Sequence, residues 1–311
     1  MSTISSRIRT DLLPLLVALV GCVLWAYWPT FSEIAHKWAH DSQYSHGYLV
    51  PVFAIYLLWR RRTQLAGAKP CLSWGGIVLL LVGLGLRLAG TMFYIVWLDA
   101  VSVLPLLAGG ALMLGGRPAF RWSWPAIGFL AFMIPLPYRV ETGLAQPLQA
   151  VATKVATYTL QTLDFPALSE GNVILVNEVR IGVVTACSGL GMLLLFFALA
   201  TAVAILVRRD LVDKCLIVAS AAPIAVAANV IRITVTAFLH VTVGGWWANL
   251  VFHDLAGWLM MPLALGMLWG ELRLLDRLLV ERPAETPETI RFVNPSSVKR
   301  PSRKRGLGTA K

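Results

Sequence analysis

Three side chains in the second half of the sequence have the types that nucleophilic acyl transfer requires. Cys187 stands at the start of a long apolar run, Arg232 lies inside the next run, and His253 begins the one after it. A thiolate can attack a carbonyl carbon, a histidine can exchange protons with the thiol and the leaving amine, and a guanidinium can donate to the oxyanion. Arginine stays protonated, so it cannot be the base. This chemistry requires that three successive apolar runs hold the three side chains at the same depth, close to one another.

The composition is typical of a polytopic membrane protein. Of the 311 residues, 57% are hydrophobic and 14% are charged, and the mean hydropathy is +0.70. Apolar runs that suit membrane spans occupy residues 12–28, 47–59, 75–91, 98–115, 123–137, 188–207, 215–239 and 255–275. We therefore predict an all-α fold, a polytopic membrane helical bundle of about eight transmembrane helices.

The basic residues set the expected orientation. Most of the 27 Lys and Arg residues form short clusters between the runs, which explains the net charge of +11 without a nucleic-acid partner. The positive-inside rule then puts both termini in the cytoplasm, in a multi-pass protein of the cytoplasmic (inner) membrane. Arg208 and Arg209 end the run that Cys187 begins, so Cys187 lies at the extracytoplasmic end. By the same topology, Arg232 falls in the outer half of its run and His253 enters from outside.

The four cysteines, Cys22, Cys71, Cys187 and Cys215, have neither paired nor metal-type spacing. This spacing argues against a disulfide framework and a metal site, and we expect no cofactor. Only Cys187 faces the outer compartment in the predicted topology. The alternative for a lone cysteine in an apolar protein is a small buried hydrophobe.

Two outer segments and the carboxy terminus complete the expected organisation. Residues 31–47 form an amphipathic piece that enters the second span. Within the longest outer segment, Val140 to Leu163 has helical apolar spacing suited to the membrane surface or the bundle, and Gly171 to Val184 resembles a small hairpin that leads to Cys187. Residues 1–280 then form the transmembrane domain, and residues 281–311 a disordered basic cytoplasmic tail.

Further residues support the three candidates. Ser188 and the following glycine allow a tight entry into a helix whose N-terminus favours a thiolate. Asn229 lies three residues before Arg232, on the same helical face. Asp254 is a candidate to orient His253, and Gly257 leaves room for a neighbouring helix or a substrate backbone. The alternatives are an arginine that snorkels to the headgroups and a histidine that is only a surface group.

At these positions the sequence resembles the exosortase/archaeosortase family of polytopic transpeptidases. The matching pieces are Thr185-Ala-Cys-Ser-Gly-Leu190, Ala228-Asn-Val-Ile-Arg-Ile233 and His253-Asp-Leu-Ala-Gly-Trp258, in the family's order. Asp41-Ser-Gln-Tyr-Ser-His-Gly47 also resembles the family's amino-terminal motif. The resemblance covers about residues 12 to 278. In this chain Leu190-Gly191-Met192 follows the cysteine motif, where many relatives have a basic residue.

The resemblance implies a sortase-like triad of Cys187, Arg232 and His253 on an unrelated, all-helical fold. Substrates would be exported proteins that end in a short motif, a transmembrane helix and a basic cluster. The enzyme would cut near the motif, hold the chain as a thioester and pass it to an acceptor. The sorting motif, the acceptor and the oligomeric state stay open.

Three other functions remain as alternatives. A transporter or exopolysaccharide-export component would need ionisable residues near the midplane, repeated in two halves, whereas Arg87 and Asp99 fall near span ends. A hydrolytic intramembrane protease would use the same triad with water as acceptor. A metal site at His36, His40 and His46 lacks an acidic or cysteine ligand at motif spacing.

Overall fold

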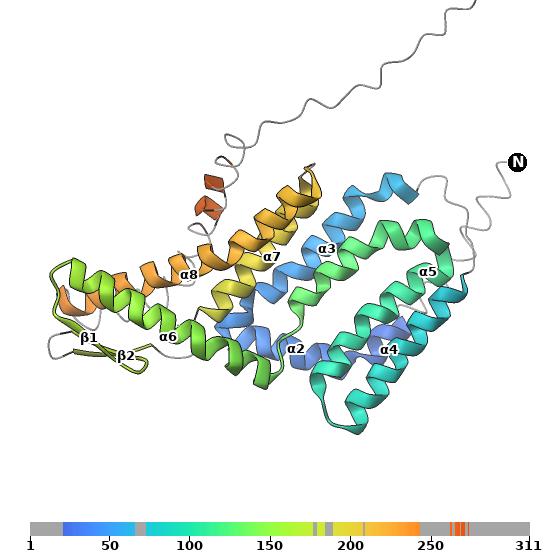
Figure 1. Ribbon diagram of the computed structural model, residues 1–311. Coiled ribbons are helices and arrows are strands. Elements are labelled where there is room, and N and C mark those ends of the chain that lie inside the picture. The colour runs from blue at the N-terminus through green and yellow to red at the C-terminus, as the bar shows by residue number, and fades with distance from the viewer. Residues whose placement is uncertain are drawn as a thin grey trace, which may run out of the picture. The chain divides into compact units, whose positions relative to one another are not determined.

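The structure of the protein is a computed structural model, which describes residues 21–65, 73–176, 179–183, 189–207 and 209–242, with isolated residues 262, 265–267, 269, 270 and 273. The chain divides into two units, Met1–Glu271 and Leu272–Lys311, and all elements below belong to the first. Its main helices are α2 (Trp28–His40), α3 (Leu49–Arg60), α4 (Trp74–Met92), α5 (Val96–Phe129), α6 (Tyr138–Thr162), α7 (Leu190–Leu206) and α8 (Leu211–Thr242). Figure 1 shows their arrangement.

The first part of the bundle is a helix, a short 3-10 segment and a second helix. Residues 21–26 are helical, and α2 follows after a turn at Tyr27 with Pro29 in its first turn. The 3-10 segment η1 (Ser42–Tyr48) leads into α3, and the Asp41 side chain caps it by accepting a hydrogen bond from the Gln43 amide at 3.0 Å. Ile34 of α2 is buried in a core formed with α3, α5 and α7. The segment expected to be amphipathic therefore packs one face, with Ile34 and Tyr44, into the bundle and leaves the other, with His36 and His40, exposed.

Helices α4 and α5 form a tightly packed hairpin. Gly76, Gly83 and Gly90 recur every seven residues on α4 and face α5, where an added Cβ would lie 2.7 to 3.1 Å from α5 backbone nitrogens. Small residues at this spacing let two membrane helices approach closely. Gly116 has a φ of +64° and a non-helical conformation, so α5 is two helical segments joined at a sharp turn. These segments correspond to the two spans predicted over 98–115 and 123–137.

The second half of the described chain combines α6, a small sheet, α7 and α8. Strands β1 (Ala167–Glu170), β2 (Val173–Val176) and β3 (Val179–Gly182) form an antiparallel sheet in the order β1-β2-β3. The predicted hairpin is β2 and β3, and β1 was not expected. Helix α6 lies along α8, with the sheet at one end (Figure 1). Buried side chains of α6, β2 and α8, among them Leu160, Ile174 and Ile233, form a second core.

Helix α6 packs on the bundle with a face of small and polar residues, and its large apolar side chains lie on another face. Leu144, Val151 and Val155 are exposed, whereas the buried side is built from small and polar residues such as Ala156, Thr153 and Gln149. The small residues let α6 lie close to α8. The apolar stripe faces outward, as expected of a helix that lies along a membrane surface.

The structure confirms an all-α membrane protein built of helices. Among the described residues, Trp74–Met92, Val96–Met133 and Leu211–Thr242 are long and apolar enough to cross a membrane, and Leu190–Leu206 is a shorter apolar helix. The span predicted over 123–137 ends early: α5 stops at Phe129 and a 3-10 turn, Leu130–Met133, follows, because Pro135 and Pro137 cannot continue the helix. Residues 12–20 and most of 255–275 lie outside the described residues.

Candidate functional site

Two anchored residues bracket the segment that contains Cys187. Before it, the Val183 amide donates to the Asn172 carbonyl at 2.8 Å, and the Val183 carbonyl accepts a hydrogen bond from the Gln149 side chain of α6. After it, Gly189 precedes α7 with a φ of +87°, a left-handed conformation that glycine adopts without strain. The segment 184–188 itself lies outside the described residues.

Gly189 lies directly against α8. A Cβ added to it would sit 2.9 Å from Asn229 Nδ2 and 3.1 Å from Asn229 Cγ, so only glycine fits this contact. Asn229 is 1% exposed, and its Oδ1 accepts a hydrogen bond from Arg232 Nη2 at 2.6 Å. The side-chain amide of Asn229 therefore touches the entry to α7 and orients the guanidinium of Arg232.

The 3-10 segment η1 packs on the other side of the α7 entry. A Cβ added to Gly191 would lie 2.8 Å from the Cα of Gln43, so the two backbones are in close contact. His46 is 5% exposed, and burial lowers its pKa below the usual value, although hydrogen bonds to the backbone of Phe132 and Gln43 oppose that effect. His46 therefore ties η1 to the 3-10 turn, Leu130–Met133, that follows α5.

A polar cluster joins η1 to α2 and α6. Tyr44 is buried, donates to Glu141 Oε2 at 3.2 Å and accepts from the Leu136 amide at 3.2 Å. Lys37 of α2 bonds the same Glu141 oxygen at 3.3 Å, and its ammonium lies 4.7 Å from the centre of the Tyr44 ring. Burial and the adjacent Glu141 carboxylate raise the pKa of Tyr44. The cluster fixes η1, which in turn holds the entry to α7.

The structure describes part of the predicted site. Arg232 and Asn229 lie together as the helical spacing predicted, and Thr236, one turn further on, is buried. The predicted site residues that lie outside the described residues are Cys187, Ser188, His253, Asp254 and Gly257. Sequence reasoning missed Gln149 and Gln43. A buried glutamine on the small-residue face of α6 would have been the signal for the first.

The charged residues cited against a transporter are paired in the structure. Arg87 Nη1 lies 3.7 Å from Asp99 Oδ1, and the guanidinium stacks 3.9 Å from the centre of the Tyr27 ring. Arg87 also donates to the Ala26 carbonyl, and Thr30 donates to Asp99. These contacts join α2, α4 and α5, which gives both charges a structural role.

The three histidines considered for a metal do not converge. His36 and His40 stack on α2 with ring centroids 4.0 Å apart, and His40 Nδ1 contacts the His36 carbonyl at 2.9 Å. His46 is buried in η1, and its ring forms hydrogen bonds with the backbone of Phe132 and Gln43. Among the described residues, no group of three or more His, Cys, Asp or Glu side chains is arranged to hold a metal ion.

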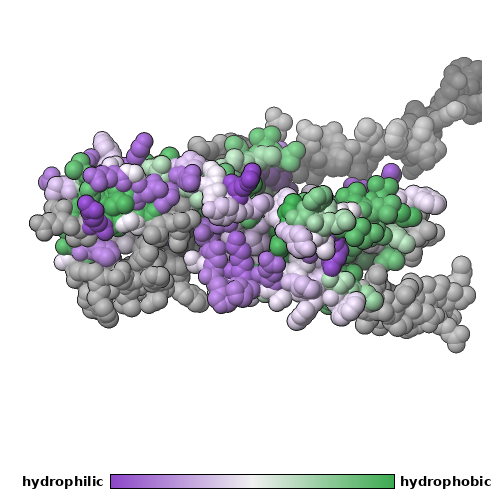
Figure 2. All heavy atoms as spheres, turned by 90° about the horizontal axis from the view of Figure 1, so that it is seen from below, coloured by the Kyte–Doolittle hydropathy of each residue, from purple (hydrophilic) through white to green (hydrophobic). Residues whose placement is uncertain are grey.

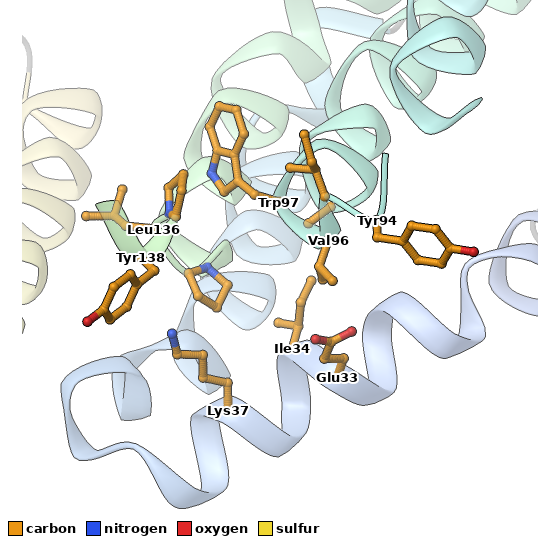
Figure 3. A pocket seen from close by; sticks show the side chains of 12 residues that line it. Glu33, Ile34, Lys37, Tyr94, Val96, Trp97, Leu136 and Tyr138 are labelled. Atoms are coloured by element: carbon orange, nitrogen blue, oxygen red, sulfur yellow. The ribbon is translucent and has the colours of Figure 1, made fainter. Parts of the chain in front are cut away.

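A cavity of about 340 Å³ lies between α2, the start of α5 and the residues before α6 (Figure 3). Glu33, Lys37, Tyr94, Trp97 and Tyr138 line it with smaller apolar residues, and Lys37 points into the space below Tyr138. Hydrophilic residues also gather in the middle of the face seen from below in Figure 2. The described lining contains no cysteine and no histidine, so this cavity does not hold the predicted Cys–His pair.

Comparison with known families decides the assignment. The model of the family described as transmembrane exosortase (Exosortase_EpsH) matches residues 38–270, three quarters of the chain. The chain belongs to the transmembrane exosortase family. No curated protein and no solved structure gives a match.

Membership in the exosortase family makes this a membrane protein of transpeptidase type. The matched range begins at Trp38, within α2, and includes η1, the α7 entry and all of α8. Every predicted site residue therefore lies within the range that matches the exosortase family.

Proposed function

We propose that this exosortase is a cysteine transpeptidase that cleaves the carboxy-terminal sorting signal of exported proteins at the outer face of the cytoplasmic membrane. The observation that carries the proposal is the contact of Gly189 with Asn229, which also bonds Arg232. Cys187 is two residues before Gly189, and two residues span at most about 7 Å. In this proposal the Cys187 thiol would therefore be within reach of the helix turn that bears the arginine.

In the proposed reaction, the Cys187 thiolate attacks the carbonyl carbon of the scissile peptide bond. Arg232 donates hydrogen bonds to the oxyanion that forms, and Asn229 holds its guanidinium in place. His253 gives its proton to the leaving nitrogen, so the carbon–nitrogen bond breaks and a thioester remains. An acceptor nucleophile then attacks the thioester, His253 takes its proton, and the Cys187 sulfur leaves as the thiolate.

The basic residues support the proposed orientation. The ends of α3 and α7 and the turn of α5 lie toward one side of the bundle in Figure 1, and Arg60, Arg61, Arg117, Arg121 and Arg209 belong to these regions. The positive-inside rule makes that side cytoplasmic. The entry to α7, at the other end of this helix, would then face outward, where an exported substrate can reach it.

The test is mass spectrometry of carboxy-terminal peptides from envelope proteins, in cells that express wild type or Cys187→Ala at matched levels. Proteins with a carboxy-terminal helix and a basic tail should accumulate uncleaved in the variant. Cys215→Ala, at an exposed cysteine near the start of α8, should process them normally. The masses of the wild-type termini distinguish transfer to an acceptor from hydrolysis. Unchanged processing by Cys187→Ala would refute the proposal.

A further inference from the structure

A second cavity, of about 510 Å³, lies at the end of the bundle that carries the basic residues. Its described lining is Arg61, Gln64, Arg117, Pro118, Arg121 and Trp124. These residues come from two segments that are far apart in the sequence, the end of α3 with the 3-10 turn (Arg62–Leu65) that follows it, and the part of α5 that follows Gly116. The cavity is separate from the candidate transpeptidase site, because none of its lining residues belongs to η1, α7 or α8.

The cavity is built around a fixed arginine. Arg61 Nη2 donates to Gln64 Oε1 and to the Arg121 carbonyl, both at 3.0 Å, and Arg61 Nε lies 3.3 Å from the same Gln64 oxygen. The turn at Gly116 starts the second segment of α5, and Trp122 Nε1 bonds the Leu58 carbonyl at 3.1 Å. These bonds hold the ends of α3 and α5 together around the cavity.

The lining has three positive charges and no negative one. Arg117 and Arg121 are four residues apart on a helix, so they share a face, and both are exposed. Within the described part of the chain, no carboxylate forms an ion pair with Arg61, Arg117 or Arg121. Burial lowers the pKa of Arg61, which means that its charge is partly removed from water. Three guanidinium groups around one space repel each other, and an anion between them would relieve that repulsion.

Exposed tryptophans indicate the depth of the cavity. Trp59 lies in the last turn of α3, Trp74 begins α4 and Trp124 lines the cavity, and they are 60%, 83% and 55% exposed. The start of α4 lies near the α5 turn, because Gly76 contacts Met113. Tryptophan side chains are enriched at the headgroup level of membranes, so the cavity opens at the depth where lipid phosphates lie.

We propose that this cavity binds the phosphate of an anionic phospholipid headgroup in the cytoplasmic leaflet. Arginine presents planar pairs of N–H donors that match phosphate oxygens. Basic pockets between membrane helices on the cytoplasmic side are suited to such headgroups. A bound headgroup would join Arg61, at the end of α3, to Arg117 and Arg121 of α5.

The test uses the full-length protein, purified in detergent and titrated with phosphatidylglycerol, phosphatidylcholine or inorganic phosphate. Native mass spectrometry counts retained lipid, and the thermal midpoint reports stabilisation. The double variant Arg117→Gln/Arg121→Gln should bind phosphatidylglycerol at least tenfold more weakly than wild type, which corresponds to about 1.4 kcal/mol. Phosphatidylcholine should bind wild type and variant equally weakly.

A second double variant, Arg60→Gln/Arg62→Gln, removes the same charge from the same end without changing the cavity lining, and it should bind like wild type. Equal loss in the two double variants would mean general charge attraction and would overturn the site. Stabilisation by inorganic phosphate equal to that by phosphatidylglycerol would overturn the lipid assignment. Single Arg117→Gln, at an exposed side chain, repeats the test if the double variant unfolds.

Discussion

Replacing Gly189 by alanine should destabilise the protein by more than backbone strain alone. The φ of +87° costs an L-residue roughly 1–2 kcal/mol. The new Cβ would also lie 2.9 Å from Asn229 Nδ2, and forced overpacking of this kind costs about 1–3 kcal/mol. Asn229 is 1% exposed and cannot move into solvent, so any shift would stretch its bond to Arg232. Gly189→Ala should therefore lower stability by about 2–5 kcal/mol and impair processing.

Gly171→Ala is the matched control. Gly171 has a similar φ of +59°, but an added Cβ would meet nothing within 4 Å. This variant should show only the backbone cost of about 1–2 kcal/mol in unfolding experiments in detergent, and it should process substrates normally. Equal loss of stability in the two variants would refute the close contact of Gly189 with Asn229.

The double variant Gly189→Ala/Asn229→Ala isolates the contact. Alanine at position 229 removes the two atoms nearest to the new Cβ and leaves the Cβ of residue 229 at 3.4 Å, an ordinary contact, so Gly189→Ala should cost little more than its backbone term in that background. Asn229→Ala alone should cost roughly 1.5–3 kcal/mol, because the Arg232 guanidinium loses an acceptor. Additive losses across the cycle would show that the two residues do not touch.

Gln149→Leu should lower the free energy of unfolding in detergent by roughly 1–3 kcal/mol and slow processing, because the Val183 carbonyl loses its hydrogen-bond donor. The control is Gln161→Leu, which removes a similar hydrogen bond from an exposed side chain and should leave processing unchanged. Burial lowers the pKa of His46, so as the pH falls the unfolded chain binds a proton at a higher pH than the folded chain does. The contribution of His46 to stability should therefore be constant above about pH 6.5 and decrease below it. Thermal midpoints measured between pH 5 and 8 should show a shallower decrease in His46→Gln than in wild type. Asp99→Ala should lower the free energy of unfolding by about 2–3 kcal/mol, which is less than the loss expected when a fully buried ion pair is broken. Adding Arg87→Met to this variant should recover part of that loss, as measured in a double-mutant unfolding cycle.

Much of the architecture could be predicted because it depends on local patterns. Apolar runs predicted helices α3, α4, α7 and α8 to within a few residues, since hydropathy and span length are properties of short windows. The pairing of Asn229 with Arg232 followed from helical periodicity, because residues three apart share a face. The early end of α5 could have been predicted from Pro135 and Pro137.

Contacts between distant segments were decided only by the tertiary structure. The sequence alone determined the membrane helices and the residue types at the site, but nothing in it showed that Gly189 meets Asn229 or that Gln43 meets Gly191. The apolar stripe of α6 was visible in the sequence, yet its small-residue face is the one that packs on α8. Such choices depend on how closely whole helices can approach, which is a property of complementary surfaces and not of any one segment.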